Sequence, residues 1–210
     1  MSSVTTWKNE FKVSVPEGKK GDWEVKRMVL TEKDVAIENI RSAWKPGSRT
    51  IDPGSYTMLN RNGQVIMSDT PSEIADHLGF IYNAEGNVLI AGLGIGVVLQ
   101  ACLRNKKVKA VTVVEKSQDV YDLVAPHYLA MEPVMLQIYV ADIFEWNPPK
   151  GVHYDHGWFD IWDNICADNL EEMTKLKRKF ARKVTHKGCW TEDLCRRYAQ
   201  EEKRNNWWRS

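Results

Sequence analysis

The sequence predicts an α/β protein in which a doubly wound, mostly parallel sheet follows a small antiparallel β-region. Residues 87–96, NVLIAGLGIG, read as a buried strand that runs into three glycines, and residues 97–103 continue as a helix. Two more apolar runs, 108–115 and 136–142, each end in a carboxylate. The first 85 residues instead carry short alternating runs and turn signals. Together these patterns indicate a Rossmann-like core behind a β-rich N-terminal region.

The N-terminal region is expected to span residues 1–85. Alternating apolar residues predict strands, and an Asn62-Gly63 pair between two apolar flanks predicts a hairpin turn. Pro71 stands in the first turn of a helical pattern, where its missing N–H costs nothing. The predicted strands cover 11–15, 23–30 and the hairpin 56–67, and the predicted helices cover 31–41 and 72–79.

The α/β core is expected over residues 86–168, and two helices are expected in residues 169–210. A helical pattern at 119–128 separates the second and third core strands, and residues 154–160 supply a fourth. The C-terminal helical patterns cover 169–182 and 191–200, with no strand predicted between them. Because so little chain follows the fourth strand, the far half of the sheet is expected to be truncated or replaced by helices.

Composition sets broader limits on function. The 29 basic and 28 acidic residues give no overall attraction to nucleic acid or to a membrane surface. The four cysteines contain no C-x-x-C pair and are expected to be reduced thiols. The longest uncharged apolar run, 88–99, is too short to cross a bilayer, and no signal peptide is recognised. A soluble, cytoplasmic protein is therefore expected.

Two C-terminal features bear on which binding partners the protein could have. Residues 175–187 hold seven Lys and Arg and no acidic residue, which could attract phosphates. Such a run is more typical of a solvated helix face, so nucleic acid is possible as a partner but not favoured. The Trp207-Trp208 pair is expected to pack on the core or to join a subunit interface, which leaves a homo-oligomer open.

The glycine turn and two strand ends predict a nucleoside site. Gly92, Gly94 and Gly96 lack the Cβ that would keep a ligand from the backbone, although their spacing differs from G-x-G-x-x-G. Glu115 ends the second strand, where it can accept hydrogen bonds from both hydroxyls of a ribose, and Asp142 ends the third. Any one of these acids could equally cap a helix or lie in a solvated loop. Their common position at the strand ends favours a binding site.

The fourth strand carries the predicted chemistry. Asp160 ends it and Asp163 lies in the following loop, so that one carboxylate could accept a proton while the other holds a positive charge. Capping of the next helix is the alternative for both. His153 and His156 could join them as metal ligands, but the segment lacks the spacing of a metal site, and no metal is expected.

The order of glycine turn, Glu115, Asp142 and Asp160 resembles the class I S-adenosylmethionine-dependent methyltransferase superfamily. Residues 154–163, YDHGWFDIWD, are similar to the tyrosine-aspartate and D-x-x-D pattern of its spermidine-synthase-like branch. Phe144, two residues after Asp142, also matches that branch. The chain further resembles phage-encoded proteins of this type in residues 67–77, MSDTPSEIADH.

The resemblance implies S-adenosylmethionine, or its decarboxylated form, as the cofactor. It implies that the three glycines face its methionine part and ribose and that Glu115 binds the ribose hydroxyls. Asp142 would accept from the adenine amino group, with Ile143 or Lys116 beside the ring. Asp160 and Asp163 are the implied catalytic pair, as base and second substrate contact. Asp69 and Gln64 are expected to bind substrate.

The first expectation for function is methyl transfer to an unknown acceptor, such as a small molecule. The alternative is aminopropyl transfer from decarboxylated S-adenosylmethionine to a polyamine, which would need an acidic amine pocket. Asn164 stands where the branch usually has a proline, which weakens the case for that pocket. A third hypothesis is a nucleoside-binding module without catalytic activity.

Overall fold

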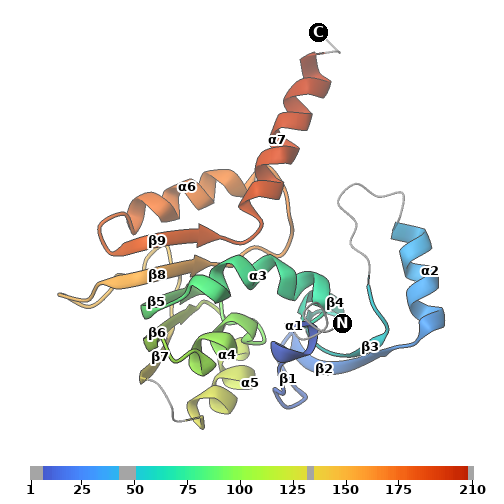
Figure 1. Ribbon diagram of the computed structural model, residues 1–210, viewed down its shortest axis with the longest axis horizontal. Helices are drawn as coiled ribbons and strands as arrows, with labels where there is room; N and C mark the ends of the chain where they lie inside the picture. The colour runs from blue at the N-terminus through green and yellow to red at the C-terminus, as the bar shows by residue number, and fades with distance from the viewer. Residues whose placement is uncertain (1–6, 43–50, 132–134, 208–210) are drawn as a thin grey trace.

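The computed structural model describes residues 7–42, 51–131 and 135–207, which form two sheets and their covering helices (Figure 1). An antiparallel sheet has the order β1-β2-β3-β4, and a parallel sheet has the order β7-β6-β5-β8-β9. The strands are β1 (Gly18–Lys20), β2 (Trp23–Leu30), β3 (Gly54–Arg61), β4 (Gln64–Ser68), β5 (Gly86–Ala91), β6 (Val108–Glu115), β7 (Met135–Val140), β8 (Tyr154–Phe159) and β9 (Val184–Cys189). The helices are α1 (Trp7–Glu10), α2 (Glu32–Ser42), α3 (Pro71–Asn83), α4 (Val97–Arg104), α5 (Gln118–Leu129), α6 (Asn169–Lys179) and α7 (Glu192–Trp207).

The parallel sheet confirms the predicted Rossmann-like class. The chain builds β5, β6 and β7 outward in one direction and then returns to place β8 and β9 on the other side of β5. Helices α3, α4 and α5 bury one face of this sheet, and α6 buries the other (Figure 1). The strand order reverses between β5 and β8, which is where open α/β sheets leave a crevice at the carboxyl ends of the strands.

Strand β9 corrects the expectation that no strand separates the last two helices. It pairs in parallel with β8, and its residues VTHKGC are mostly polar. Only its first and last residues, Val184 and Cys189, are buried. A sheet-edge strand with few apolar side chains gives almost no periodic signal, which explains the miss. Among the described residues, no further strand follows β9.

Residues 11–15 correct a second expectation, since they form no strand. Their alternation is real, because Phe11, Val13 and Val15 are all buried. Their backbone, however, bonds to side chains: the Val13 N–H donates to Asp69 Oδ2 at 3.0 Å, and the Val13 carbonyl accepts from Thr57 Oγ1 at 3.2 Å. Alternating burial therefore arose here without a strand ladder.

The remaining predicted elements of the N-terminal region and the core are confirmed within a few residues. The hairpin turns at Asn62 (φ 52°) and Gly63 (φ 80°), the left-handed values that a two-residue hairpin loop requires. Helix α7 is longer than predicted and extends away from the body (Figure 1). The side chains of Trp207 and Trp208 lie outside the described residues. None of the described helices combines the length and apolarity needed to cross a membrane.

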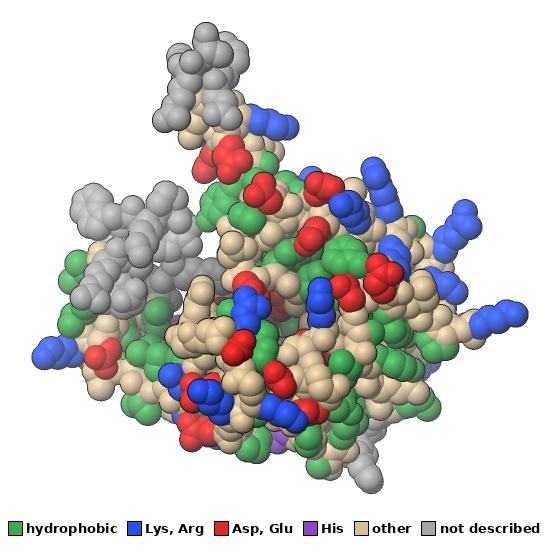
Figure 2. All heavy atoms as spheres, turned by 180° about the vertical axis from the view of Figure 1, so that it is seen from behind, with side chains coloured by type: hydrophobic (Ala, Val, Ile, Leu, Met, Phe, Trp, Pro, Cys, Tyr) green, Lys and Arg blue, Asp and Glu red, His purple; other side chains and the backbone are tan. Residues whose placement is uncertain are grey.

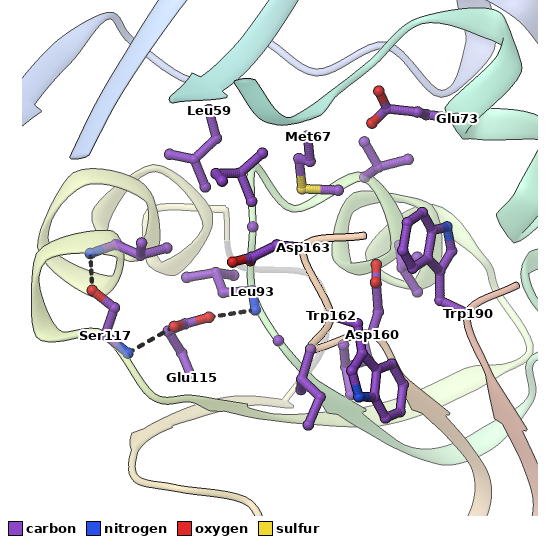
Figure 3. Close-up of a pocket in the computed structure, with 18 of the residues that line it drawn as sticks. Leu59, Met67, Glu73, Leu93, Glu115, Ser117, Asp160, Trp162, Asp163 and Trp190 are labelled. Atoms are coloured by element: carbon purple, nitrogen blue, oxygen red, sulfur yellow. Dashed lines mark hydrogen bonds between the residues drawn. The ribbon is translucent and has the colours of Figure 1, made fainter. Parts of the chain in front are cut away.

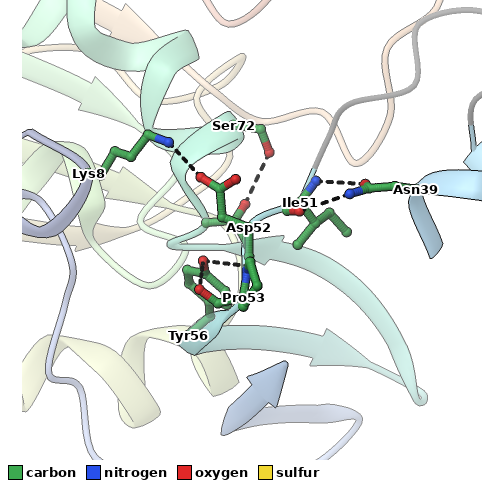
Figure 4. A network of polar contacts seen from close by, with 8 residues as sticks. Lys8, Asn39, Ile51, Asp52, Pro53, Tyr56 and Ser72 are labelled. Atoms are coloured by element: carbon green, nitrogen blue, oxygen red, sulfur yellow. Dashed lines mark hydrogen bonds and ion pairs between the residues drawn. The ribbon is translucent and has the colours of Figure 1, made fainter. Parts of the chain in front are cut away.

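A polar network fixes the start of β3 (Figure 4). Lys8 Nζ lies 2.6 Å from Asp52 Oδ2, and the Tyr56 hydroxyl donates to the Asp52 carbonyl at 2.8 Å. On α2, the Asn39 amide exchanges two hydrogen bonds with the backbone of Ile51, at 3.0 and 3.2 Å. These contacts hold α1 and α2 to the strand that carries the antiparallel sheet toward the crevice.

Candidate functional site

A cavity of about 930 Å³ occupies the crevice at the carboxyl ends of the parallel strands (Figure 3). Its walls come from the antiparallel sheet, α3, the glycine loop and the loops that follow β6, β7 and β8. Ligand pockets span roughly 300–1,000 Å³, so this cavity can hold a nucleoside ligand together with a small second molecule. The predicted residues that line it are Gly92, Gly94, Glu115, Asp142, Ile143, Asp160 and Asp163.

The glycine loop presents bare backbone to the cavity at two positions. Gly92 has φ 91°, and a Cβ placed there would lie 1.9 Å from the Asp160 carbonyl oxygen. Gly94 has φ 52°, and its Cβ would lie 2.1 Å from Met67 Sδ. The Ile95 N–H donates to the same sulfur at 3.3 Å. A side chain at either glycine would therefore displace neighbours as well as strain the backbone.

Gly96 is a glycine for a different reason. It precedes α4 with φ 80°, and a Cβ there would lie 2.3 Å from the ring of Tyr128. Tyr128 is fully buried, and its hydroxyl donates to the Ile95 carbonyl at 2.8 Å. Gly96 is not among the residues that line the cavity. Its conformation serves the packing of α5 against the loop.

Glu115 joins the end of β6 to the glycine loop (Figure 3). Its Oε2 accepts the Leu93 N–H at 2.7 Å, and its Oε1 accepts the Ser117 N–H at 2.7 Å. Burial raises the pKa of Glu115, although backbone N–H donors, Leu93 first, act in the opposite direction. The Lys116 and Gly94 N–H groups also act on this carboxylate, which has about four acceptor positions. These backbone donors fix the side chain at the end of β6.

Asp142 follows β7 and is equally well fixed. Its Oδ1 accepts the Phe144 N–H at 2.8 Å, and its Oδ2 lies 2.8 Å from Lys116 Nζ. The hydrogen bond from Lys116 and then that from Phe144 lower the pKa of Asp142, so this carboxyl is ionised near neutral pH. Ile143, next along the chain, is buried and adds an apolar wall.

Asp160 and Asp163 occupy contrasting environments. The Asp160 side chain is 18% exposed, and its Oδ2 lies 3.8 Å from His77 Nε2. Burial, followed by the nearby charges of Glu73, Asp76 and Glu115, raises the pKa of Asp160 to about 8. Asp163 is 41% exposed and pairs with Arg61. Asp160 is therefore protonated over most of the neutral range, whereas Asp163 already has a cationic partner.

The two predicted substrate residues lie outside the cavity wall. Asp69 is 1% exposed and accepts backbone N–H groups from Val13 at 3.0 Å and Thr57 at 2.7 Å. It therefore ties the N-terminal segment to β3. Gln64 is exposed in β4 beside the hairpin turn. Neither side chain is among those that line the cavity.

Several cavity residues were not predicted from the sequence (Figure 3). They share an aromatic, acidic or sulfur side chain, and they are Met67, Glu73, His77, Trp158, Trp162 and Trp190. The Glu73 and His77 spacing of four on α3 was an available signal, because it puts both on one helix face. Trp190 follows the unpredicted β9, so its position could not be anticipated.

The basic segment 175–187 is partly engaged in local contacts. Lys175 Nζ lies 2.7 Å from Glu171, Lys177 pairs with Glu192, and Lys179 donates to the Phe144 carbonyl. On the face shown in Figure 2, basic and acidic side chains are interspersed. Nucleic acid binding by this segment stays a prediction that is not favoured. Among the described residues, no group of three or more His, Cys, Asp or Glu side chains is arranged to hold a metal ion.

No protein-family model matches this sequence, and no curated protein matches it. Solved structures with similar folds include an S-adenosylmethionine-dependent methyltransferase from Clostridium acetobutylicum, with 14% identity and a TM-score of 0.38 over 54% of this chain and 44% of that one. Coclaurine N-methyltransferase bound to N-methylheliamine and SAH has 17% identity and a TM-score of 0.41, over 54% of this chain and 32% of that one. The N-terminal domain of EvdMO1 with SAH bound has 15% identity and a TM-score of 0.42, over 56% of this chain and 48% of that one.

The present chain thus spans less than half the length of each of these structures. A shared fold at this level of identity does not determine what a site binds. The chemistry of the lining residues has to decide that question.

Proposed function

We propose that this chain binds S-adenosylmethionine in the crevice cavity and transfers its methyl group to a small-molecule acceptor. One observation carries the proposal: Gly92, Gly94, Glu115, Asp142 and Asp160 come from the ends of four neighbouring strands and line a single cavity. An adenosyl sulfonium would need the bare backbone of the glycines and the two fixed acceptors, Glu115 and Asp142. A nucleophile would need a carboxyl whose charge can change, which is Asp160.

Within this proposal the cofactor lies along the glycine loop. Its methionine part would pack on the backbone of Gly92 and Gly94, and its ribose hydroxyls would donate to the Glu115 carboxylate. The adenine amino group would donate to Asp142, and the ring would pack on Ile143. Because Glu115 and Asp142 are already held by other donors, binding would cost little side-chain ordering.

The proposed reaction asks little of the protein in acid catalysis. The acceptor nucleophile attacks the methyl carbon, and the leaving thioether is neutral and needs no proton. The protein supplies proximity, in-line alignment and a base for the proton of the nucleophile. Asp160 is the proposed base, since it lines the cavity and its backbone packs against Gly92. Asp163, held by Arg61, is the proposed second contact to the acceptor.

Calorimetric titration with S-adenosylmethionine tests the cofactor assignment. The wild-type protein should bind it, and Glu115→Ala should weaken binding by about 100-fold or more, because hydrogen bonds to charged groups contribute roughly 1.5–3 kcal/mol each. Glu172→Gln is a matched control, since Glu172 lines the same cavity but is exposed at its rim, where it accepts the Trp162 Nε1–H. Failure of the wild-type protein to bind, or equal effects of both variants, would reject the assignment.

Aminopropyl transfer is the second candidate, and the acidity of the cavity favours it. Glu73, Asp160 and Asp163 line the same space as the indole rings of Trp162 and Trp190, a combination that suits an amine cation. The two reactions differ in the cofactor, because aminopropyl transfer needs decarboxylated S-adenosylmethionine. Tighter binding of the decarboxylated form in the same titration would favour this candidate over methyl transfer.

A further inference from the structure

Asp160 lies at the most negatively charged end of the cavity. Glu73 and Asp76 approach it from α3, and Glu115 approaches it from β6, and all three act on its charge. The Trp190 indole N–H donates to Asp76 at 3.1 Å, which holds that carboxylate near the wall. His77, also on α3, brings Nε2 to 3.8 Å from Asp160 Oδ2 and is itself 1% exposed.

Asp160 Oδ2 and His77 Nε2 lie 3.8 Å apart, close enough that the charge of one group affects the other. A proton on the carboxyl with a neutral imidazole, and an ionised carboxylate with an imidazolium, contain the same number of protons. Without a ligand, loss of that proton would leave an additional buried negative charge beside Glu73, Asp76 and Glu115, so the pair retains it. While the carboxyl holds this proton, Asp160 cannot accept another from a nucleophile.

A sulfonium in the cavity would reverse this preference. The Asp160 carbonyl oxygen packs against Gly92, on the loop where the proposed cofactor lies, so the mostly buried carboxyl and the sulfonium would share one cavity. Opposite charges in such an environment attract far more strongly than in bulk water. An ionised Asp160 carboxylate beside a neutral His77 is unfavourable in the empty cavity. It becomes favourable when a positive charge enters.

We propose that Asp160 and His77 form a charge sensor, in which binding of S-adenosylmethionine drives a proton from the pair into solvent and so prepares the base before the acceptor binds. This inference rests on the proposed function. It assigns His77 as a positioning residue that shares the proton, and it predicts that the cofactor binds before the acceptor.

The reaction then conserves the charge of the cavity. The nucleophile forms a bond to the methyl carbon, and the carbon–sulfur bond breaks with its electron pair remaining on sulfur. The proton of the nucleophile passes to the Asp160 and His77 pair as the sulfonium becomes a neutral thioether. One positive charge is lost and one proton is regained, so the product complex has the same net charge as the cofactor complex. S-adenosylhomocysteine should therefore bind without releasing a proton.

Three other cavity carboxylates are poor candidates for this role. Asp142 and Asp163 already have the cationic partners Lys116 and Arg61. Glu115 accepts two backbone N–H groups that stabilise its ionised form. Burial and the nearby carboxylates favour the protonated form of Asp160, and the imidazole of His77 lies 3.8 Å from it.

Calorimetry in buffers of different ionisation enthalpy measures the linked protons directly. Between pH 6.5 and 7.5, binding of S-adenosylmethionine should release close to one proton, and the release should fall toward zero above about pH 9, where the pair is already deprotonated. S-adenosylhomocysteine, which lacks the sulfonium charge, should release almost none. Asp160→Asn should abolish the release, while Asp163→Asn should preserve it.

Each result decides a separate point. Binding of S-adenosylmethionine without proton release, or equal release with S-adenosylhomocysteine, would overturn the charge sensor and leave the proposed function standing. Release that persists in Asp160→Asn would overturn the assignment to this pair. Binding of S-adenosylhomocysteine by Asp160→Asn with wild-type affinity is the control that the variant is folded. No binding of either ligand to the wild-type protein would contradict the proposed function and the sensor together.

Discussion

The two walls of the cavity use carboxylates in opposite ways. On the β6 and β7 side, Glu115 and Asp142 are each held by backbone N–H groups, and Asp142 also by Lys116. On the β8 and α3 side, Asp160 meets a buried histidine and the charges of other carboxylates. The first wall is organised for recognition by fixed acceptors. The second holds a group whose charge can change, which is what proton transfer requires.

The largest expected effect comes from the second wall. Asp160→Asn should slow methyl transfer by roughly 10²–10⁴-fold, the usual contribution of a general base. Transfer of labelled methyl groups from S-adenosylmethionine into a small-molecule extract measures this rate before the acceptor is identified. Undiminished transfer would show that another group accepts the proton.

Gly96→Ala and Gly94→Ala should separate stability from binding. At Gly96 the new methyl group would meet the buried Tyr128 ring, so we expect a loss of about 3 kcal/mol in the free energy of unfolding from overpacking and backbone strain. At Gly94 the obstacle is the flexible Met67 side chain, so the loss should be nearer 1 kcal/mol. Gly94→Ala should instead weaken S-adenosylmethionine binding. Denaturant unfolding measures the stability of both variants, and calorimetry measures their S-adenosylmethionine binding. A smaller loss of stability in Gly96→Ala than in Gly94→Ala would contradict this interpretation.

The pH dependence of stability provides a third contrast. The folded-state pKa of Asp160 is raised to about 8, so the folded protein holds a proton that the unfolded chain releases near its usual pKa of 3.8. The resulting stability is present below pH 4 and is lost as the pH rises toward 8. Asp160→Asn cannot ionise, so it should gain stability on the wild type as the pH rises from 4 to 8, by about 5 kcal/mol for a shift of this size. Thermal unfolding of both proteins across this pH range measures the difference. If their stabilities change in parallel with pH, Asp160 holds no buried proton.

The smallest effect is expected at Asp142, where the proposed contact is a single hydrogen bond near the cavity edge. Asp142→Asn should weaken S-adenosylmethionine binding by about 10-fold, because one charged hydrogen bond is lost and Lys116 keeps a solvated position. The same variant should leave the proton release from the Asp160 wall unchanged. An effect as large as that of Glu115→Ala would contradict the proposed orientation of the adenine.

Local patterns predicted the first wall well. The strand, glycine turn and helix around Gly94 are continuous in sequence, and Glu115 directly ends the next apolar run. Parallel strands bring their carboxyl ends to one edge, so these residues could be placed together without a structure. Asp160 followed from the same rule, because it directly follows β8, which pairs in parallel with β5.

The second wall depends on contacts between distant segments, which sequence patterns do not reveal. A Cβ at Gly157 would lie 2.8 Å from Val184, and one at Gly188 would lie 2.7 Å from the Trp158 ring. Both glycines make room for large side chains on the neighbouring strand of the β8 and β9 pair. His77 likewise enters the site only because α3 packs beside β8.

The three glycines of the loop illustrate the same limit. They look equivalent in sequence, but Gly92 and Gly94 line the cavity while Gly96 accommodates Tyr128. Tyr128 lies on α5, and only the packing of that helix distinguishes the last glycine from the first two.

A crystal structure of the protein with S-adenosylhomocysteine would test the central claim most directly. We predict that both ribose hydroxyls donate to Glu115, that the adenine amino group donates to Asp142, and that the homocysteine part lies over Gly92 and Gly94. A ligand bound elsewhere, or in the cavity without contact to Glu115, would contradict the claim that these strand ends form one adenosyl site.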